Sequence, residues 1–248
     1  MIHPATIHDF KMSLFYLPFR KESAPVNMAT DMWLLSKAAL WGGTIFRRYG
    51  WNTPEITFGY GQKADWVCDE TGSSIDSITR RPTGGGIVRH GTDLTYCLVA
   101  PRGSRAEQMP PMQFYGFIHE KWAEALQEQG ISCSLMPCPQ QSKSNIPGDC
   151  FKEPVGRDLM DSSGKIKLGG AAMKRTRSGM LLQGTLELGE WPELNHSEIE
   201  ARFLYLFAED ISEELCPKQW PRELEKERAA QVKNFQSLMW NQKRKSLG

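Results

Sequence analysis

The sequence has no surplus of charge of either sign. Its 248 residues include 30 lysines and arginines against 29 acidic residues, which gives a formal net charge of +1. A protein that binds nucleic acid needs an excess of cations to displace counterions from the phosphates. The charge balance therefore argues against a nucleic-acid partner.

Long hydrophobic runs are also missing. No apolar stretch approaches the roughly 20 residues that a helix needs to cross a bilayer. The N-terminal apolar segment at residues 12–18 is short, ends in proline and is not followed by the small residues of a cleavage site. We therefore expect no membrane span, no signal peptide and a cytoplasmic location.

Cysteines are few and widely spaced. The nearest pair of the six, Cys133 and Cys138, has no further His or Cys at the spacing of zinc ligands. We expect no metal site, and free thiols are the natural state in a reducing compartment.

What the chain does contain is an ordinary globular composition, with 40% hydrophobic and 24% charged residues. Its length favours one large domain over residues 1–248, with a core at about 27–215 and a helical tail at 197–248. Strands and helices interleave without a regular βαβ rhythm, so the patterning predicts an α+β fold.

Local patterns place several elements. Apolar residues at helical spacing predict a helix at residues 27–40, with Asn27 as its cap, and another at 115–126. Short strands are expected at positions rich in β-branched and aromatic residues: 45–46, 56–58, 94–99, 131–135 and 180–186. The residues between the first two strands, 49–54, are expected to form a turn.

The second half of the chain carries a long aperiodic segment. Residues 137–154 are rich in Ser, Gln, Pro and Gly, which predicts an active-site loop, since long loops inside compact domains are usually functional. A hairpin with strands at 157–160 and 165–168 is expected next. The charged residues 221–245 are interpreted as a solvated helix without a role in the site.

Three consecutive glycines at residues 84–86, here called the glycine loop, leave backbone N–H groups unshielded by side chains. Such a loop can approach a phosphate, a thioester carbonyl or an acyl chain, although a plain turn has the same appearance. Its spacing is neither that of a Walker loop nor that of a Rossmann turn. Arg80 and Arg81 precede it and His90 follows, which favours a binding site.

Two further residues could carry chemistry. Lys167 lies at an expected strand end beside two glycines, where it projects either into a pocket or into solvent. In the expected hairpin Asp158 faces Lys167 and would orient its ammonium, but a slip of one residue would destroy the pair. Cys150 is either a core cysteine or a nucleophile activated by a nearby cation.

The motifs resemble those of a known superfamily. Residues 80–90, Arg-Arg-Pro-Thr-Gly-Gly-Gly-Ile-Val-Arg-His, are similar to the signature of the biotin/lipoate protein ligases and octanoyltransferases. Residues 167–172, Lys-Leu-Gly-Gly-Ala-Ala, resemble its Lys-x-x-Gly-x-Ala block, and residues 183–185, Gln-Gly-Thr, resemble its His/Gln-Gly-Ser/Thr strand. The likeness covers nearly the whole chain, from residue 27 to residue 244.

This resemblance implies a catalytic domain built on a mixed β-sheet flanked by helices. It implies that Lys167 contacts the carbonyl of the bound acyl group and stabilises charge on its oxygen, as an oxyanion hole does. The residues that it assigns to acyl or substrate binding are Arg81, Thr83, Gly84, Gly85, Gly86, His90, Gly170, Ala171 and Gly184.

Two segments separate the branches of the superfamily. Residues 90–96, His-Gly-Thr-Asp-Leu-Thr-Tyr, lack the His-Asp-x-Gly-Asn of lipoate ligases and look more like the cysteine-dependent octanoyltransferases. Residues 150–154, Cys-Phe-Lys-Glu-Pro, match the Cys-Phe-x-x-Pro segment of those transferases, which implies that Cys150 is catalytic. Gly91 and Asp149 depart from the pattern, and a carboxylate beside a thiol opposes its ionisation.

The resemblance implies a transferase that moves an octanoyl group from acyl carrier protein, through Cys150, to a lysine of a lipoyl carrier domain. Acceptors of this kind are the lipoyl domains of 2-oxoacid dehydrogenases and the glycine cleavage H protein, and no cofactor is required. One alternative is a lipoate–protein ligase that uses ATP and Mg²⁺, in which Cys150 is a bystander. A second alternative is an inactive homologue that binds acyl groups or carrier domains.

Overall fold

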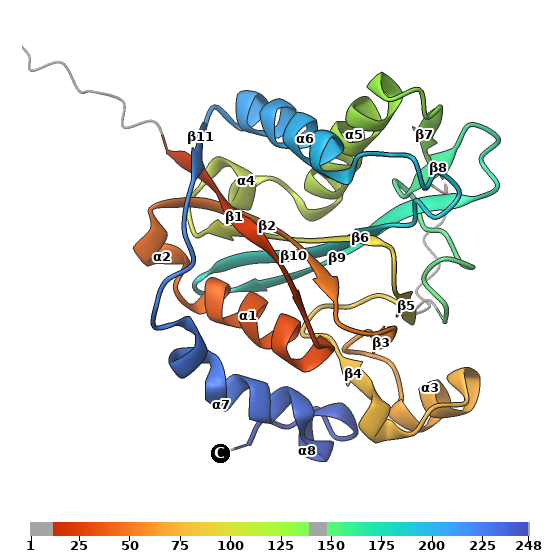
Figure 1. Ribbon diagram of the computed structural model, residues 1–248, viewed down its shortest axis with the longest axis vertical. Coiled ribbons are helices and arrows are strands. Elements are labelled where there is room, and N and C mark those ends of the chain that lie inside the picture. The colour runs from red at the N-terminus through yellow and green to blue at the C-terminus, as the bar shows by residue number, and fades with distance from the viewer. Residues whose placement is uncertain (1–11, 139–147, 248) are drawn as a thin grey trace, which may run out of the picture.

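The computed structural model describes residues 12–138 and 148–247 (Figure 1). Within these residues, eight strands form a mixed sheet in the order β11-β1-β2-β6-β10-β9-β8-β7, and three strands form a smaller sheet in the order β4-β3-β5. The strands of the large sheet, in that order, are Glu214–Pro217, Ser13–Glu22, Gly43–Trp51, Leu94–Pro101, Gly179–Leu186, Lys167–Thr176, Leu159–Asp161 and Cys133–Leu135. Those of the small sheet are Ile78–Arg80, Glu55–Phe58 and Val88–His90.

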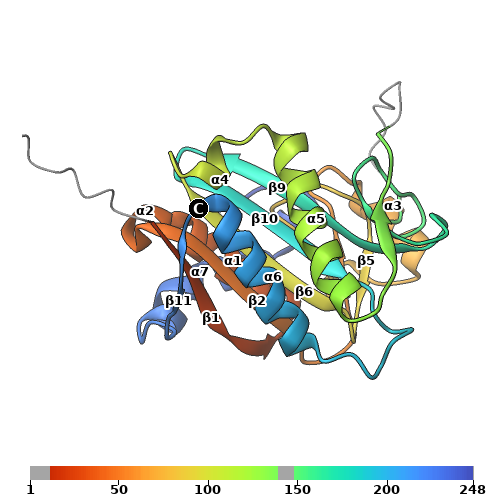
Figure 2. The same ribbon diagram turned by 90° about the horizontal axis from the view of Figure 1, so that it is seen from above.

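Helices cover both faces of the large sheet (Figures 1 and 2). The pair α5 and α6 packs on one face, and α1 with α7 packs on the other. The helices are α1 (Ala24–Ser36), α2 (Ala38–Trp41), α3 (Ala64–Thr71), α4 (Arg105–Gln108), α5 (Pro111–Glu128), α6 (His196–Ile211), α7 (Leu224–Gln236) and α8 (Leu238–Asn241). The predicted α+β fold with a mixed sheet flanked by helices is confirmed.

The central strand β6 shows why both faces must be covered. Every residue of β6 is buried, because alternate side chains enter opposite cores. Tyr96 and Leu98 join the core under α5 and α6, whereas Cys97 and Val99 join the core under α1. In the described part of the chain, no helix is long and apolar enough to cross a membrane.

The first helix begins earlier than the sequence indicated. It starts at Ala24 after Ser23, with proline in its first turn, so the prediction that Asn27 caps it is wrong. Asn27 is instead buried, and its Nδ2 donates to the carbonyl oxygen of Gly50 at 3.1 Å. The helix also ends earlier than residue 40, at Ser36, and the short α2 follows it.

The predicted turn after β2 is partly wrong as well. Tyr49 and Trp51 lie in the strand, at 1% and 4% exposure, because their large rings are buried on the α1 side of the sheet. The strand β2 therefore runs on to the region where the small sheet begins.

The C-terminal part of the chain is not plain surface. It contains the strand β11, which pairs in parallel with β1, and its helix α7 packs against α1 through buried Leu224 and Phe235. In α8, the carbonyl oxygen of Asn241 accepts from Nε and Nη2 of Arg80 at 3.0 and 2.7 Å. The expectation that residues 221–245 have no role is therefore wrong, since they hold the arginine that precedes the glycine loop.

Candidate active site

A buried ion pair forms the base of the site. The ammonium of Lys167, at the start of β9, lies 2.7 Å from the carboxylate of Asp158, and both side chains are almost completely shielded from solvent. The contact expected from the hairpin is thus present, although the register is different. Met160 pairs with Lys167 and Leu159 with Gly169, and a bulge between them returns Asp158 to the lysine.

Asp158 is fixed by further donors. The hydroxyl of Tyr115 on α5 donates to one carboxylate oxygen, and the backbone N–H of Val155 donates to the other at 2.7 Å. A carboxylate that accepts bonds from three directions has little freedom to move, so it holds the lysine ammonium in one place.

Cys150 lies next to the lysine of this pair. The ammonium of Lys167 donates to the carbonyl oxygen of Cys150 at 2.8 Å and lies 3.5 Å from its Sγ. The backbone N–H of Cys150 donates to the carbonyl oxygen of Ile87 at 3.0 Å, while the N–H of Ile87 donates to Gly148 at 2.9 Å. The cysteine segment is therefore held beside the strand that leaves the glycine loop, and a cation beside the sulfur stabilises negative charge there.

The glycine loop is folded around its own arginine. The guanidinium of Arg81 donates to the carbonyl oxygens of Gly84 and Gly86 at 3.0 and 2.7 Å, and to the hydroxyl of Thr57 at 2.8 Å. Burial lowers the pKa of Arg81, and the charge of Cys150 opposes this effect. Gly85 adopts a φ of 87°, which glycine accepts readily and a residue with a Cβ does not.

His90 belongs to a chain of buried polar groups. Its Nδ1 lies 2.8 Å from the carboxylate of Asp93 and its Nε2 lies 2.8 Å from the hydroxyl of Thr57, which also accepts from Arg81. Because Nδ1 faces a carboxylate, it carries the proton, and Nε2 accepts from Thr57. The indole of Trp51 stacks on the imidazole at a centroid distance of 3.9 Å.

Burial and hydrogen bonds set the protonation states of His90 and Asp93. Burial lowers the pKa of His90, although its bond to Asp93 acts in the opposite direction. Burial by itself would raise the pKa of Asp93, but bonds from His90, Thr185 and Thr95 outweigh burial and hold it below the usual range. The imidazole is therefore neutral and the carboxylate charged at neutral pH.

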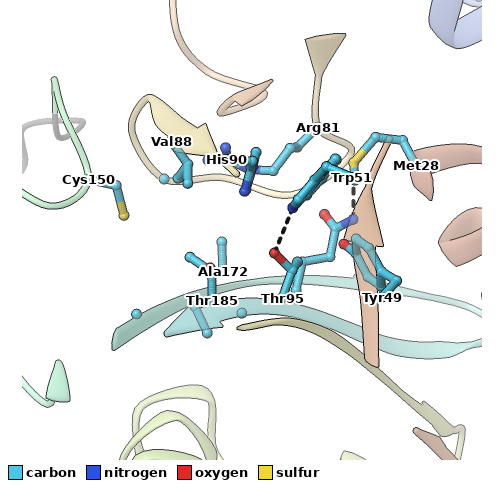
Figure 3. Close-up of a pocket in the computed structure, with 15 residues that line it drawn as sticks. Met28, Tyr49, Trp51, Arg81, Val88, His90, Thr95, Cys150, Ala172 and Thr185 are labelled. Atoms are coloured by element: carbon cyan, nitrogen blue, oxygen red, sulfur yellow. Dashed lines mark hydrogen bonds between the residues drawn. The ribbon is translucent and has the colours of Figure 1, made fainter. Parts of the chain in front are cut away.

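Between these groups lies a pocket, here called the Cys150 pocket (Figure 3). Of the residues singled out from the sequence, the structure brings seven to its wall: Arg81, Gly85, His90, Cys150, Gly170, Ala171 and Gly184. Eight more complete the wall: Met28, Tyr49, Trp51, Val88, Thr95, Ala172, Gln183 and Thr185.

The remaining predicted residues stand behind the wall. Thr83 donates to the side-chain oxygen of Gln183 at 2.6 Å, and Gly84 and Gly86 hold Arg81 through their carbonyl oxygens. These three residues do not line the pocket, and their assignment to acyl or substrate binding stays a prediction. Lys167 and Asp158 do not line the pocket either, but Nζ of Lys167 lies 3.5 Å from the sulfur of Cys150, which does.

Sequence reasoning missed several wall residues. Gln183 and Thr185 were within the quoted motifs, so their positions carried a signal. Met28, Tyr49 and Trp51 come from α1 and β2, far from every motif, and no local pattern marked them. The packing of α1 on the sheet brings Met28 to the pocket, and the pairing of β2 with β6 brings Tyr49 and Trp51 there.

Gly170 is required by the position of the lysine. A Cβ at this residue would lie 2.7 Å from Cε and 2.8 Å from Nζ of Lys167. The bare backbone therefore provides the space through which the lysine side chain reaches Asp158 and Cys150.

Residues 23–190 match the model of the lipoyl protein ligase A/B catalytic domain. The chain belongs to this family. It is 30% identical over 220 residues to an octanoyltransferase LipM of Oceanobacillus iheyensis, covering 82% of this chain and 78% of the relative. A second octanoyltransferase LipM, from Kyrpidia tusciae, is 29% identical over 70% of this chain and 65% of the relative.

Solved structures of lower identity share the fold of the family. A putative lipoate protein ligase from T. acidophilum with bound lipoic acid has a TM-score of 0.72 at 17% identity, covering 94% of this chain and 99% of that one. A lipoate-protein ligase A bound with ATP has a TM-score of 0.71 at 17% identity, covering 93% and 98%.

The two departures from the family pattern have structural answers. Asp149 does not stand as an isolated charge, because its carboxylate lies 2.8 Å from Nη1 of Arg89 and 3.8 Å from Nζ of Lys152. At Gly91, the backbone N–H donates to Asp93 at 2.8 Å, so a carboxylate two residues later occupies the space beside His90.

The described part of the site holds no evident metal centre. Within residues 12–138 and 148–247, no three His, Cys, Asp or Glu side chains gather closely enough to bind an ion. The chemistry available at the pocket is instead that of a thiol beside an ammonium, with an apolar cavity next to both.

Proposed function

We propose that this protein is an octanoyltransferase of protein lipoylation and that Cys150 carries the acyl group. The observation that supports this most directly is the position of Cys150, which lines the Cys150 pocket and has its Sγ 3.5 Å from Nζ of Lys167. A nucleophile, a cation and a cavity lined largely by aromatic, aliphatic and glycine residues are what transfer of a fatty acyl group requires. Relatives named octanoyltransferase agree with this reaction.

The first step exchanges one thioester for another. The Cys150 thiolate attacks the carbonyl carbon of octanoyl-loaded acyl carrier protein, and the ammonium of Lys167 stabilises the oxyanion of the tetrahedral intermediate. Collapse breaks the original C–S bond and releases the carrier thiolate. The products are octanoyl-Cys150 and the free carrier, with no net change in protons.

The second step forms an amide. The neutral ε-amine of a lysine on a lipoyl carrier domain attacks the carbonyl carbon of octanoyl-Cys150, and Lys167 again stabilises the oxyanion. The C–S bond breaks, the Cys150 thiolate returns, and the new amide loses one proton to solvent. The reaction needs neither ATP nor a metal ion, and a free thiol suits a reducing compartment such as the cytoplasm.

The acceptor is proposed to be a lipoyl domain of a 2-oxoacid dehydrogenase or the glycine cleavage H protein. A structural relative from Thermoplasma acidophilum, a bipartite lipoate protein ligase, has been studied with its E2 lipoyl domain. Acyl carrier protein is proposed as the donor because its thioester supplies an activated octanoyl group.

Intact mass spectrometry tests the proposal. The protein is mixed with octanoyl-loaded acyl carrier protein, first alone and then with an unmodified lipoyl domain, with and without ATP. We expect octanoylated enzyme in the first mixture and octanoylated lipoyl domain in the second, both independent of ATP. Cys150→Ala should abolish both products, whereas Cys216→Ala, at a half-buried cysteine on the far edge strand β11, should not.

Two outcomes would overturn the proposal. A strict need for ATP and free lipoate, with Cys150→Ala still active, would instead establish a lipoate–protein ligase. No modification of the lipoyl domain with either donor would establish an inactive homologue that binds acyl groups or carrier domains.

A further inference from the structure

Met28 and Tyr49 line the end of the Cys150 pocket that lies opposite its nucleophile. Figure 3 shows Cys150 at one end and Met28 with Tyr49 at the other, with Trp51 and His90 on one wall and Ala172 and Thr185 on the facing wall. An acyl chain attached to the sulfur would run between these walls toward Met28. On the basis of the proposed function, we infer that Met28 is the residue that limits the length of the acyl chain.

Met28 is held firmly in this position. It is 1% exposed, and its Sδ accepts from Nε2 of Gln183 at 3.2 Å. The same amide nitrogen donates to Asp31 at 2.6 Å, and the amide oxygen accepts from Thr83 at 2.6 Å. Every polar atom of the Gln183 side chain is therefore engaged, and its amide plane ties the thioether to a buried carboxylate.

Tyr49 is tied to the same carboxylate. Its hydroxyl donates to Asp31 at 3.3 Å, and the guanidinium of Arg47 lies over its ring at 4.0 Å. Arg47 and Asp31 form an ion pair of 2.6 Å, with both side chains at 0% exposure. The pocket end is therefore backed by a buried network rather than by mobile side chains, and such networks keep a core in one arrangement.

The side chains at the end of the pocket determine which acyl chains fit there. Met28 presents a thioether and Tyr49 a ring, while the polar groups behind them are already hydrogen-bonded to one another. An acyl chain with an apolar end is thus accepted, and a polar chain end would find its potential partners occupied. A chain too long for the space must displace Met28 and break the bond to Gln183, and one methylene in a tight apolar pocket changes efficiency by about tenfold or more.

Variants that shorten or enlarge the side chain at position 28 test the inference. Met28→Ala shortens the side chain and should lengthen the preferred chain by two or three carbons. Met28→Phe fills the end and should lower efficiency with octanoyl at least tenfold while shorter chains still react. Met32→Ala is the matched control, since Met32 is half-buried one turn along the same helix and does not line the pocket.

Two measurements are made for each variant. The first follows the rate at which Cys150 is acylated by saturated acyl-coenzyme A thioesters of four to twelve carbons, by intact mass. The second measures, by calorimetry, the binding of free fatty acids of the same lengths to proteins that also carry Cys150→Ser. Circular dichroism spectra that match the wild type confirm folding.

Opposite shifts of the chain-length optimum in Met28→Ala and Met28→Phe, with no shift in Met32→Ala, support the inference. An unchanged optimum in both Met28 variants, or an equal shift in Met32→Ala, overturns it. The second measurement separates this result from the proposed function. Absence of any acyl-enzyme in the wild type rejects the transferase, whereas chain-length-dependent binding of fatty acids still decides the role of Met28.

Discussion

The carboxylate of Asp158 lies 2.7 Å from the ammonium of Lys167, and both side chains are almost completely buried. Lys167 in turn reaches the sulfur of Cys150. A buried ammonium is tolerated only when it is paired. The carboxylate therefore offsets the desolvation of the lysine and also directs the ammonium at the thiol.

Replacing this carboxylate separates orientation from stability. Asp158→Asn leaves the ammonium unpaired, and we expect about 3–5 kcal/mol less stability, measured by urea unfolding. Acylation of Cys150 should slow by about a hundredfold, since a displacement of about 1 Å has this effect on a positioned group. The double variant Asp158→Asn/Lys167→Met should recover stability but not acylation; recovery of both would show that Lys167 has no part in the reaction.

The ion pair between Arg89 and Asp149 should tune the reactivity of Cys150. Other charges near this thiol are Lys167, which contacts it directly, and the more distant Arg81. Arg89→Gln leaves the carboxylate of Asp149 without its closest cation, so alkylation of Cys150 by iodoacetamide at pH 7 should slow. Asp149→Asn should accelerate it.

The size and control of this effect follow from exposure. Because the Arg89 side chain is 47% exposed, we expect changes of only about two- to threefold, which high salt should remove. The double variant should react as the wild type does. If both single variants change the rate in the same direction, the pair does not act through charge.

Gly170 and Gly91 are a matched pair of positions for testing whether the Lys167 side chain needs the space beside Gly170. A Cβ on Gly170 would lie 2.7 Å from Cε of Lys167, whereas a Cβ on Gly91 would meet no described atom within 4 Å. Gly170→Ala should therefore displace the ammonium and lower the transfer rate by about a hundredfold. Gly91→Ala should leave the rate unchanged. Equal rates for the two variants would show that Lys167 has room to adapt.

Buried His119 makes stability depend on pH. Burial lowers its pKa to about 4, against a value of about 6.5 in an unfolded chain. The unfolded state therefore binds more protons between these values, and stability falls as pH decreases through that range. From this residue we expect a loss of about 2 kcal/mol between pH 7 and pH 5, measured by urea unfolding.

A variant isolates this contribution. His119→Gln keeps a polar group beside the carbonyl oxygen of Arg157, to which Nδ1 of His119 lies at 2.7 Å. The variant should lose markedly less stability than the wild type over the same pH range. An identical loss in both proteins would assign the pH dependence to other groups, among them His90, whose pKa burial also lowers.

The reactive residues of this protein lie in short segments that can be identified without the structure. The arginines and glycines at 80–86, the lysine beside Gly170 and the cysteine before Phe151 are local patterns, and their chemistry follows from residue type and spacing. The contact of Asp158 with Lys167 was also within reach, because residues of one hairpin meet whatever the fate of the rest of the chain. The α+β class followed from the alternation of strand and helix signals.

The walls of the site, by contrast, depend on tertiary packing. Met28 meets Gln183 because α1 packs on the face of the sheet that carries this glutamine, and Asn241 reaches Arg80 across 161 positions of sequence. Such contacts leave no periodic signal, since they depend on the packing of elements that are independent along the chain. The hairpin register was likewise changed by a bulge that no residue pattern marked. Short sequence motifs thus supply the reactive groups, while the packing of distant elements shapes their pocket.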